Sequence, residues 1–225
     1  MSANGAPRTA IIGTGRSGTG YAARLITETS TTPSANCGHE GWWRALGEPV
    51  PGLDCDASWL ALPDIEAGAW SGPVVHIVRD PVATVQSLLR TEFFGMIADT
   101  PYPSFAMEHC KAAADALAVS PVAAAVEFWA DWNARCAAVA QLTVRIEDVS
   151  DWEGGPDSIA AATRDLIGDV LGIEFGAWQL AAAIPTDVNH RPHPINDDLV
   201  LKVDEAYVWD RLGWRAPALG YGAAS

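Results

Sequence analysis

The chain has 225 residues, 49% of them hydrophobic, which is enough to bury a sizeable core in a single domain over residues 1–225. Its formal net charge of −14 excludes a general surface for nucleic acid or anionic membrane, because such surfaces need clustered lysine and arginine. No apolar run is long enough to span a bilayer and no signal-peptide pattern opens the chain, so we expect a cytoplasmic protein.

The first predicted elements are a strand, a glycine-rich turn and a helix. Thr9–Ile12 is a short apolar run typical of a buried strand, and Gly13–Gly18 predicts a tight turn. An apolar face repeats through Thr19–Thr29, which predicts a helix. A helix that follows a glycine loop presents free backbone N–H groups at its N-terminus, where an anion can bind.

A second strand and helix follow the same plan. The run VVHIV predicts a buried strand at Val74–Val78, and Arg79 comes directly after it. Asp80 is a good N-cap and Pro81 a good first helical residue, so a helix is expected over Pro81–Arg90.

The rest of the chain continues the alternation of helices and strands. The remaining predicted elements are a helix over 121–140, a strand over 142–146, helices over 158–171 and 203–212, and a polar loop over 181–199. Strands that alternate with helices indicate a parallel sheet covered on both faces. The expected class is therefore α/β, a three-layer α/β/α fold with a central parallel sheet.

The glycine loop allows three interpretations. As GxGxxG it fits a dinucleotide site, with Glu40 about 20 residues on as the ribose-binding acid, but no clear apolar strand leads into Glu40. As a nucleoside-triphosphate loop it lacks the lysine, because Thr19 stands in that position. In the third interpretation, Arg16 adds a cation to an anion site made of loop amides and hydroxyls.

The second strand favours the third interpretation. Arg79 closes the strand and Ser87 follows eight residues later, about two turns into the predicted helix. The two side chains can converge on one further phosphate. With RSGTG at 16–20, RDPVATVQS at 79–87 and RIEDV at 145–149, in this order, the chain resembles the PAPS-dependent sulfotransferases, and most closely small bacterial members.

The resemblance implies a P-loop-like sulfotransferase fold and transfer of a sulfonate group from PAPS, which leaves PAP, to a hydroxyl or amine acceptor. CGHE at 37–40 is similar to the segment that carries a catalytic glutamate in part of the family. Glu40 is then the general base, with the adjacent His39 as the alternative, and Arg16 stabilises the leaving phosphate. The residues implied in PAPS binding are Gly15, Arg16, Ser17, Gly18, Thr19, Gly20, Arg79, Ser87 and, from the polar loop, Arg191.

The chain departs from the family pattern at two positions. Gly20 stands where a threonine or serine is usual, which removes one hydroxyl from the phosphosulfate site, and Ile146 replaces a tyrosine. Two alternatives to a sulfotransferase stay open: an NAD-dependent Rossmann oxidoreductase, and a degenerate nucleotide-binding protein without turnover.

Further expectations concern metal, thiols and partners. We expect no metal site, because Pro192 interrupts the one H-x-x-H pair, His190 and His193, and so removes its helical geometry. The four cysteines show no CxxC spacing and are expected to be reduced thiols. The acceptor is a small molecule, sugar or peptide hydroxyl. Because the chain is short for the family, its acceptor cleft is either open or completed by a second subunit in a homodimer.

Overall fold

The computed structural model describes residues 9–29, 37–40, 53–94, 101–150 and 203–222. The described residues fall into two compact units, which are treated separately below. The first unit comprises those within 1–13, 17–78 and 136–190, and the second those within 14–16, 79–135 and 191–225. The helix predicted over 158–171, the polar loop over 181–199 and Arg191 lie outside the described residues. A single domain over 1–225 stays a prediction.

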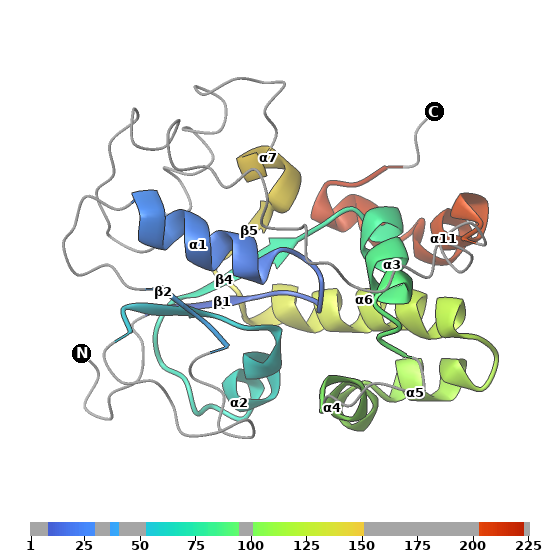
Figure 1. Ribbon diagram of the computed structural model, residues 1–225, viewed down its shortest axis with the longest axis horizontal. Coiled ribbons are helices and arrows are strands. Elements are labelled where there is room, and N and C mark those ends of the chain that lie inside the picture. The colour runs from blue at the N-terminus through green and yellow to red at the C-terminus, as the bar shows by residue number, and fades with distance from the viewer. Residues whose placement is uncertain (1–8, 30–36, 41–52, 95–100, 151–202, 223–225) are drawn as a thin grey trace. The chain divides into compact units, whose positions relative to one another are not determined.

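The first unit contains a five-stranded, all-parallel sheet with the strand order β2-β3-β1-β4-β5, flanked by helices (Figure 1). The α/β class predicted from the sequence is confirmed. The strands are β1 (Thr9–Ile12), β2 (Cys37–His39), β3 (Cys55–Ala57), β4 (Val74–Val78) and β5 (Leu142–Arg145).

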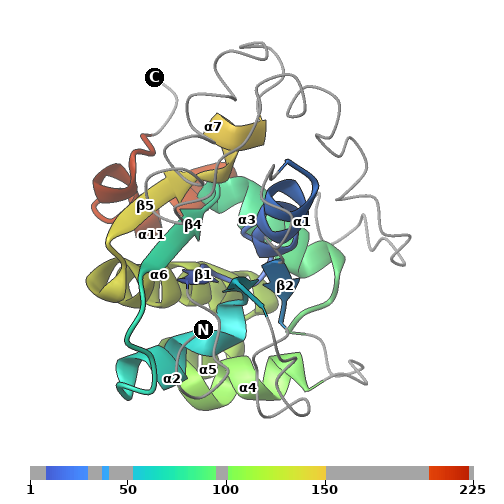
Figure 2. The ribbon, with the colours of Figure 1, turned by 90° about the vertical axis from the view of Figure 1, so that its left-hand side faces the viewer.

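The two faces of this sheet are covered by different helices of the first unit. Helix α1 (Thr19–Thr29) and helix α7 (Ile146–Ser150) pack on one face, where Ile11 of β1 joins buried residues of both helices in one core cluster. Helix α2 (Leu62–Glu66) lies on the other face, as Figure 2 shows from a second side. Because successive strand residues point to opposite faces, Ile11 and its neighbour Ala10 contact different layers.

Strands β1 and β4 are buried on both faces and have continuous apolar runs, which made them predictable from the sequence. Every residue of β1 and of β4 is buried, and continuous apolar runs are typical of such strands. The bounds predicted for both strands and for α1 are confirmed. The strand predicted over 142–146 ends one residue earlier, at Arg145, because Ile146 begins helix α7.

The second unit is helical. Its helices are α3 (Pro81–Arg90), α4 (Tyr102–His109), α5 (Lys111–Leu117), α6 (Pro121–Val139, which continues into the first unit) and α11 (Glu205–Leu212). The bounds predicted for α3 are confirmed, and Asp80 is its N-cap, since a side-chain oxygen accepts a hydrogen bond from the Ala83 N–H at 2.8 Å. Phe128, Trp129 and Trp132 of α6 are fully buried.

Short 3-10 turns complete the described structure at Trp59–Ala61 and Ala216–Leu219. None of the helices in the described part of the chain combines the length and the apolar character that crossing a bilayer requires. A cytoplasmic location stays a prediction.

Two strands were missed by the sequence analysis. Strands β2 and β3 have three residues each, and both include small or polar side chains, so neither shows an apolar run. The sequence shows no clear apolar strand before Glu40, and the structure places the short, non-apolar strand β2 there, ending at His39. Backbone pairing of β2 with β3 holds these short strands in the sheet, and no local sequence pattern indicates that pairing.

The expectation of four reduced thiols was also wrong. Cys37 and Cys55 are partners across the β2–β3 ladder, with their Cα atoms 4.6 Å apart, and form a disulfide. Their separation of 18 residues gave no hint of this, because the register of two parallel strands is set by the sheet and not by the sequence separation. Cys110 and Cys136 are buried and form no disulfide, and burial raises the pKa of the Cys110 thiol to about 12, which keeps it protonated and unreactive.

Replacing both paired cysteines, in the variant Cys37→Ser/Cys55→Ser, should lower the melting temperature of the protein. A loop of this size contributes about 3 kcal/mol, or roughly 6–12 °C in a chain of this length. Calorimetry with and without dithiothreitol measures the effect. The double variant should not respond to the reductant, and a wild-type melting temperature that also ignores it would contradict the disulfide.

Candidate functional site

The glycine-rich loop between β1 and α1 has two positions, Gly13 and Gly18, at which only glycine fits. A Cβ at Gly13 would collide with the carbonyl oxygen of Ile77 and with Ser17 Oγ. Gly18 has a φ of +102°, and a Cβ there would lie 2.7 Å from Cγ1 of Ile146 in α7. The RIEDV element singled out in the sequence thus packs under the loop through Ile146. The tight curl of the loop requires both glycines.

Two buried hydroxyls in this loop have no hydrogen-bond partner among the described residues. Thr14 and Ser17 are each 0% exposed, and neither Oγ1 of Thr14 nor Oγ of Ser17 is paired. An unpaired buried hydroxyl is costly, and such a group in a native protein calls for an explanation such as a ligand. Ser17 lies two residues before α1, whose N-terminus offers backbone N–H groups of the kind that bind a phosphate or sulfate group.

In the second unit, the structure brings together three residues predicted from the sequence, which we call the arginine–serine cluster: Arg16, Arg79 and Ser87. Arg16 donates from Nε to Oγ of Ser87 at 3.0 Å, and Arg79 donates from Nη1 to the backbone oxygen of Arg16 at 3.3 Å. Both arginines are partly exposed, whereas Ser87 is buried on α3. The Arg79 guanidinium is thus bonded to the backbone of Arg16, and the Arg16 guanidinium to Ser87, so that two cationic residues are held together in an acidic protein.

The backbone of Arg16 is itself unusual. Its φ is 70°, in the left-handed region, and only Glu40 and Glu92 share a positive φ among the described residues other than glycine. Left-handed conformations cost free energy in a residue with a Cβ and concentrate at functional sites. Two of these three residues, Arg16 and Glu40, were predicted as site residues from the sequence alone.

Trp129 positions Arg79 and was not foreseen. Its Nε1 donates a hydrogen bond to the carbonyl oxygen of Arg79 at 3.1 Å, from the middle of α6. The side chain is fully buried, so it is a core residue as well. No local pattern signals this contact, because the partner lies 50 residues earlier in the chain. Gly15, also in this unit, faces the rings of Phe93 and Phe128.

The first unit holds a second group of predicted residues, which we call the imidazole cluster: Thr19, Gly20, His39 and Glu40. Nε2 of His39 lies 3.5 Å from Thr19 Oγ1 and 3.8 Å from Oε1 of Glu40. A Cβ on Gly20 would lie 3.3 Å from the same nitrogen. The imidazole ring therefore stands directly over the first turn of α1.

The pairing of β2 with β3 holds the imidazole cluster in place. Beyond the end of β2, the Glu40 N–H donates to the carbonyl oxygen of Ala57 at 3.2 Å. The disulfide fixes Cys37 at the start of β2. A Cβ at Gly38 would collide with the side chains of Leu53 and Asp56, so this position of β2 requires glycine. The hydrogen bond and the disulfide hold the backbone that carries His39 and Glu40.

The strand order disfavours the dinucleotide interpretation of the loop. In a dinucleotide-binding fold, the acid that binds the ribose ends the strand next to the first strand. Here β2, which leads into Glu40, is separated from β1 by β3. Two strand spacings amount to roughly 10 Å, which takes Glu40 away from the ribose position.

Other expectations fall outside these clusters. Arg191, His190 and His193 lie beyond the described residues, so their predicted roles remain predictions. Within the described part of the chain, no three His, Cys, Asp or Glu side chains are grouped as a metal site would require. Glu147 and Asp148 belong to the first turn of α7.

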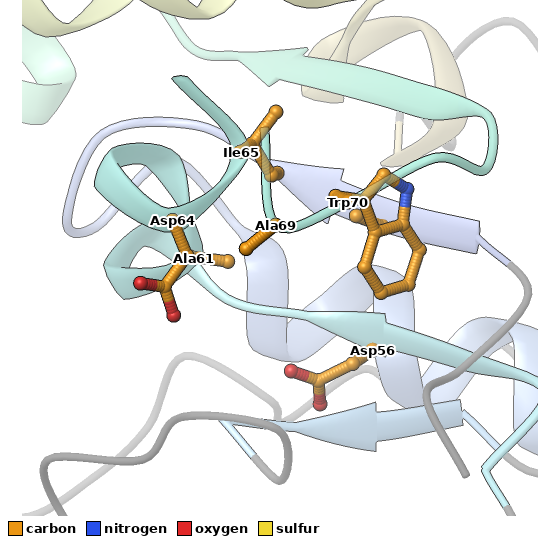
Figure 3. Close-up of a pocket in the computed structure, with 7 residues that line it drawn as sticks. Asp56, Ala61, Asp64, Ile65, Ala69 and Trp70 are labelled. Carbon is orange, nitrogen blue, oxygen red and sulfur yellow. The ribbon is translucent and has the colours of Figure 1, made fainter. Parts of the chain in front are cut away.

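A small pocket of the first unit lies apart from the predicted site residues. It opens between β1, β3 and α2, where Figure 3 shows the carboxylates of Asp56 and Asp64 and the indole of Trp70. Its lining is formed by Ala10, Asp56, Ala61, Asp64, Ile65, Ala69 and Trp70. None of these residues belongs to the loop or to either cluster.

Comparisons with known proteins agree with this architecture. No family model matches the chain, and no curated protein matches its sequence. A solved structure, that of a sulfotransferase from Alicyclobacillus acidocaldarius, is similar over 96% of this chain and 96% of its own, with a TM-score of 0.50 and 14% sequence identity. At this identity the likeness establishes the fold alone, which is a sulfotransferase-like α/β fold.

Gly18→Ala tests the packing of the loop on Ile146. The strained φ and the clash together should destabilise the protein by roughly 2–5 kcal/mol. Gly68→Ala is a matched control, because Gly68 also has a positive φ, of 76°, and a Cβ there would meet no atom within 4 Å. The control should lose only about 1–2 kcal/mol in urea unfolding. Equal losses in the two variants would mean that the loop does not press on Ile146.

Proposed function

We propose that the protein transfers a sulfonate group from PAPS to the hydroxyl or amine of a small-molecule, sugar or peptide acceptor. The observation that carries the proposal is the arginine–serine cluster. Arg16 lies in a phosphate-loop motif, while Arg79 and Ser87 form the R-x7-S motif of a later strand and helix, and the three are linked by hydrogen bonds of 3.0 and 3.3 Å. The sulfotransferase-like fold supports the same proposal.

The tight glycine loop before the N-terminus of α1 supports the binding of a phosphosulfate there. Thr14 and Ser17 are buried without partners among the described residues, and Gly13 and Gly18 leave no room for side chains. The residues assigned to the phosphosulfate are Gly15, Arg16, Ser17, Gly18, Thr19 and Gly20, whereas Arg79 and Ser87 are assigned to the 3′-phosphate. Arg191 is retained as a further ligand because it belongs to the polar stretch 189–193, which the sequence leaves open as either a lid over the 3′-phosphate or acceptor, or a plain surface loop.

Charge explains how these residues would act. When bound, PAPS supplies an activated sulfonate with a phosphate leaving group. Arg16 and the amides at the N-terminus of α1 stabilise the negative charge that develops on that phosphate. Glu40 takes the proton from the attacking hydroxyl as general base, and a carboxylate suits this task because it has only acceptor oxygens.

Transfer itself is tested with PAPS carrying a labelled sulfonate and a panel of phenol, sugar and amine acceptors. Label on an acceptor supports the proposal. PAP binding without any transfer would favour the degenerate nucleotide-binding protein, and stabilisation by NADH but not by PAP would favour the oxidoreductase.

Arg79→Ala should weaken the binding of PAP roughly 10–100-fold, because a charge-assisted hydrogen bond is lost. Isothermal titration calorimetry measures the dissociation constant. Arg90→Ala is the matched control, since it removes the same charge from an exposed position on α3 and should bind PAP as the wild type does. Unchanged affinity in Arg79→Ala would remove Arg79 from the site.

Glu40→Gln should slow sulfonate transfer about 10²–10⁴-fold and leave PAP affinity nearly intact, because the base is lost while the anion ligands stay. The release of PAP from PAPS with the acceptor panel gives the rate. Glu108→Gln, at an exposed position of α4, serves as the control and should transfer normally. A wild-type rate in Glu40→Gln would assign the base to another residue.

A further inference from the structure

The imidazole ring of His39 lies against the space that a side chain at residue 20 would need. A Cβ built on Gly20 meets three atoms of the imidazole ring at 3.3, 3.4 and 3.6 Å and no other residue at closer range. Gly20 is the second residue of α1, so its missing side chain leaves a gap at the helix N-terminus. His39, which comes from the end of β2, fills that gap.

The atom of His39 nearest to the helix is Nε2, and its surroundings favour a hydrogen on it. Glu40 Oε1 lies 3.8 Å away, and a carboxylate oxygen can only accept. Thr19 Oγ1 lies 3.5 Å away, at the outer limit of a hydrogen bond. Among the described residues, neither of these two partners is close enough to satisfy the Nε2–H fully, so the donor can serve an anion at the first turn of α1.

A second observation points to an anion at this turn. Ser17, two residues before the helix, is fully buried, and its hydroxyl has no hydrogen-bond partner in the described part of the chain. The N-terminus of an eleven-residue helix adds its unpaired amides and the positive end of its dipole. The Ser17 hydroxyl and the helix amides can donate hydrogen bonds, and the helix N-terminus carries partial positive charge. The imidazole Nε2–H adds one more donor.

We propose that His39 is an anion ligand rather than the general base: its Nε2–H donates to the 5′-phosphate side of the bound nucleotide and takes the role that a hydroxyl at residue 20 would otherwise have. The proposal rests on the proposed function. Glu40, the neighbouring carboxylate, keeps the role of base. Glycine at residue 20 and histidine at residue 39 are therefore a matched pair, since a larger residue 20 would displace the ring.

The pair is tested by exchanging its two members and measuring PAP binding by calorimetry. His39→Ala should weaken PAP binding roughly 10–100-fold, because a hydrogen bond to a charged phosphate is lost. Gly20→Ser on its own should also weaken binding, since its Cβ crowds the imidazole. The double variant Gly20→Ser/His39→Ala should recover most of the affinity, because the serine hydroxyl then fills the place of the ring.

Gly20→Ala/His39→Ala is the control for this rescue, because it restores a Cβ without a hydroxyl and should bind as weakly as His39→Ala. Melting temperatures without PAP check that every variant is folded. Wild-type protein that does not bind PAP would overturn the proposed function itself. Wild type that binds PAP while His39→Ala binds equally well, or a serine that gives no rescue, would overturn only the role of His39.

Discussion

The hydrogen bond from Arg16 Nε to Ser87 Oγ is the interaction on which the account of the site depends. It joins residues 71 positions apart, and Arg79 adds a second link through the carbonyl oxygen of Arg16. Neither link is local, so each needs the supports around it: the left-handed backbone of Arg16, the N-cap of α3 by Asp80, and the indole N–H of Trp129 on the carbonyl of Arg79. Two positively charged side chains repel each other, whereas both attract an anion.

The net charge of −14 explains why the positive charge of the arginine–serine cluster matters for the proposed binding of an anion. An acidic protein repels a multiply charged nucleotide unless donors are concentrated at one place. Within the second unit, the arginine–serine cluster concentrates donors in this way. Under the proposed function, anion binding depends on a few such groups.

The sequence predicted those parts of the fold whose residues carry their own signal. Strands β1 and β4 and helices α1 and α3 were bounded correctly, because apolar runs, the N-cap Asp80 and Pro81 mark them directly. Strands β2 and β3 were missed, because each has only three residues, including a glycine or an aspartate, and so shows no hydrophobic periodicity. The disulfide was missed for the same reason, because Cys37 and Cys55 meet only through the pairing of those strands. Motif spacing singled out Arg16, Arg79 and Ser87 as site residues, but it did not predict their direct hydrogen bonds, because it assigned Arg16 to the opposite end of the nucleotide from Arg79 and Ser87. The contact of Trp129 and the fit of His39 over Gly20 depend on packing that no sequence pattern shows.

A crystal structure of the protein with PAP bound tests the central claim most directly, because it locates both phosphate groups of one ligand. The account predicts the 5′-phosphate at the turn from Gly15 to Gly20 and the 3′-phosphate within hydrogen-bond distance of Arg79 and Ser87. Density for PAP at another surface, with both arginines away from its phosphates, would contradict it.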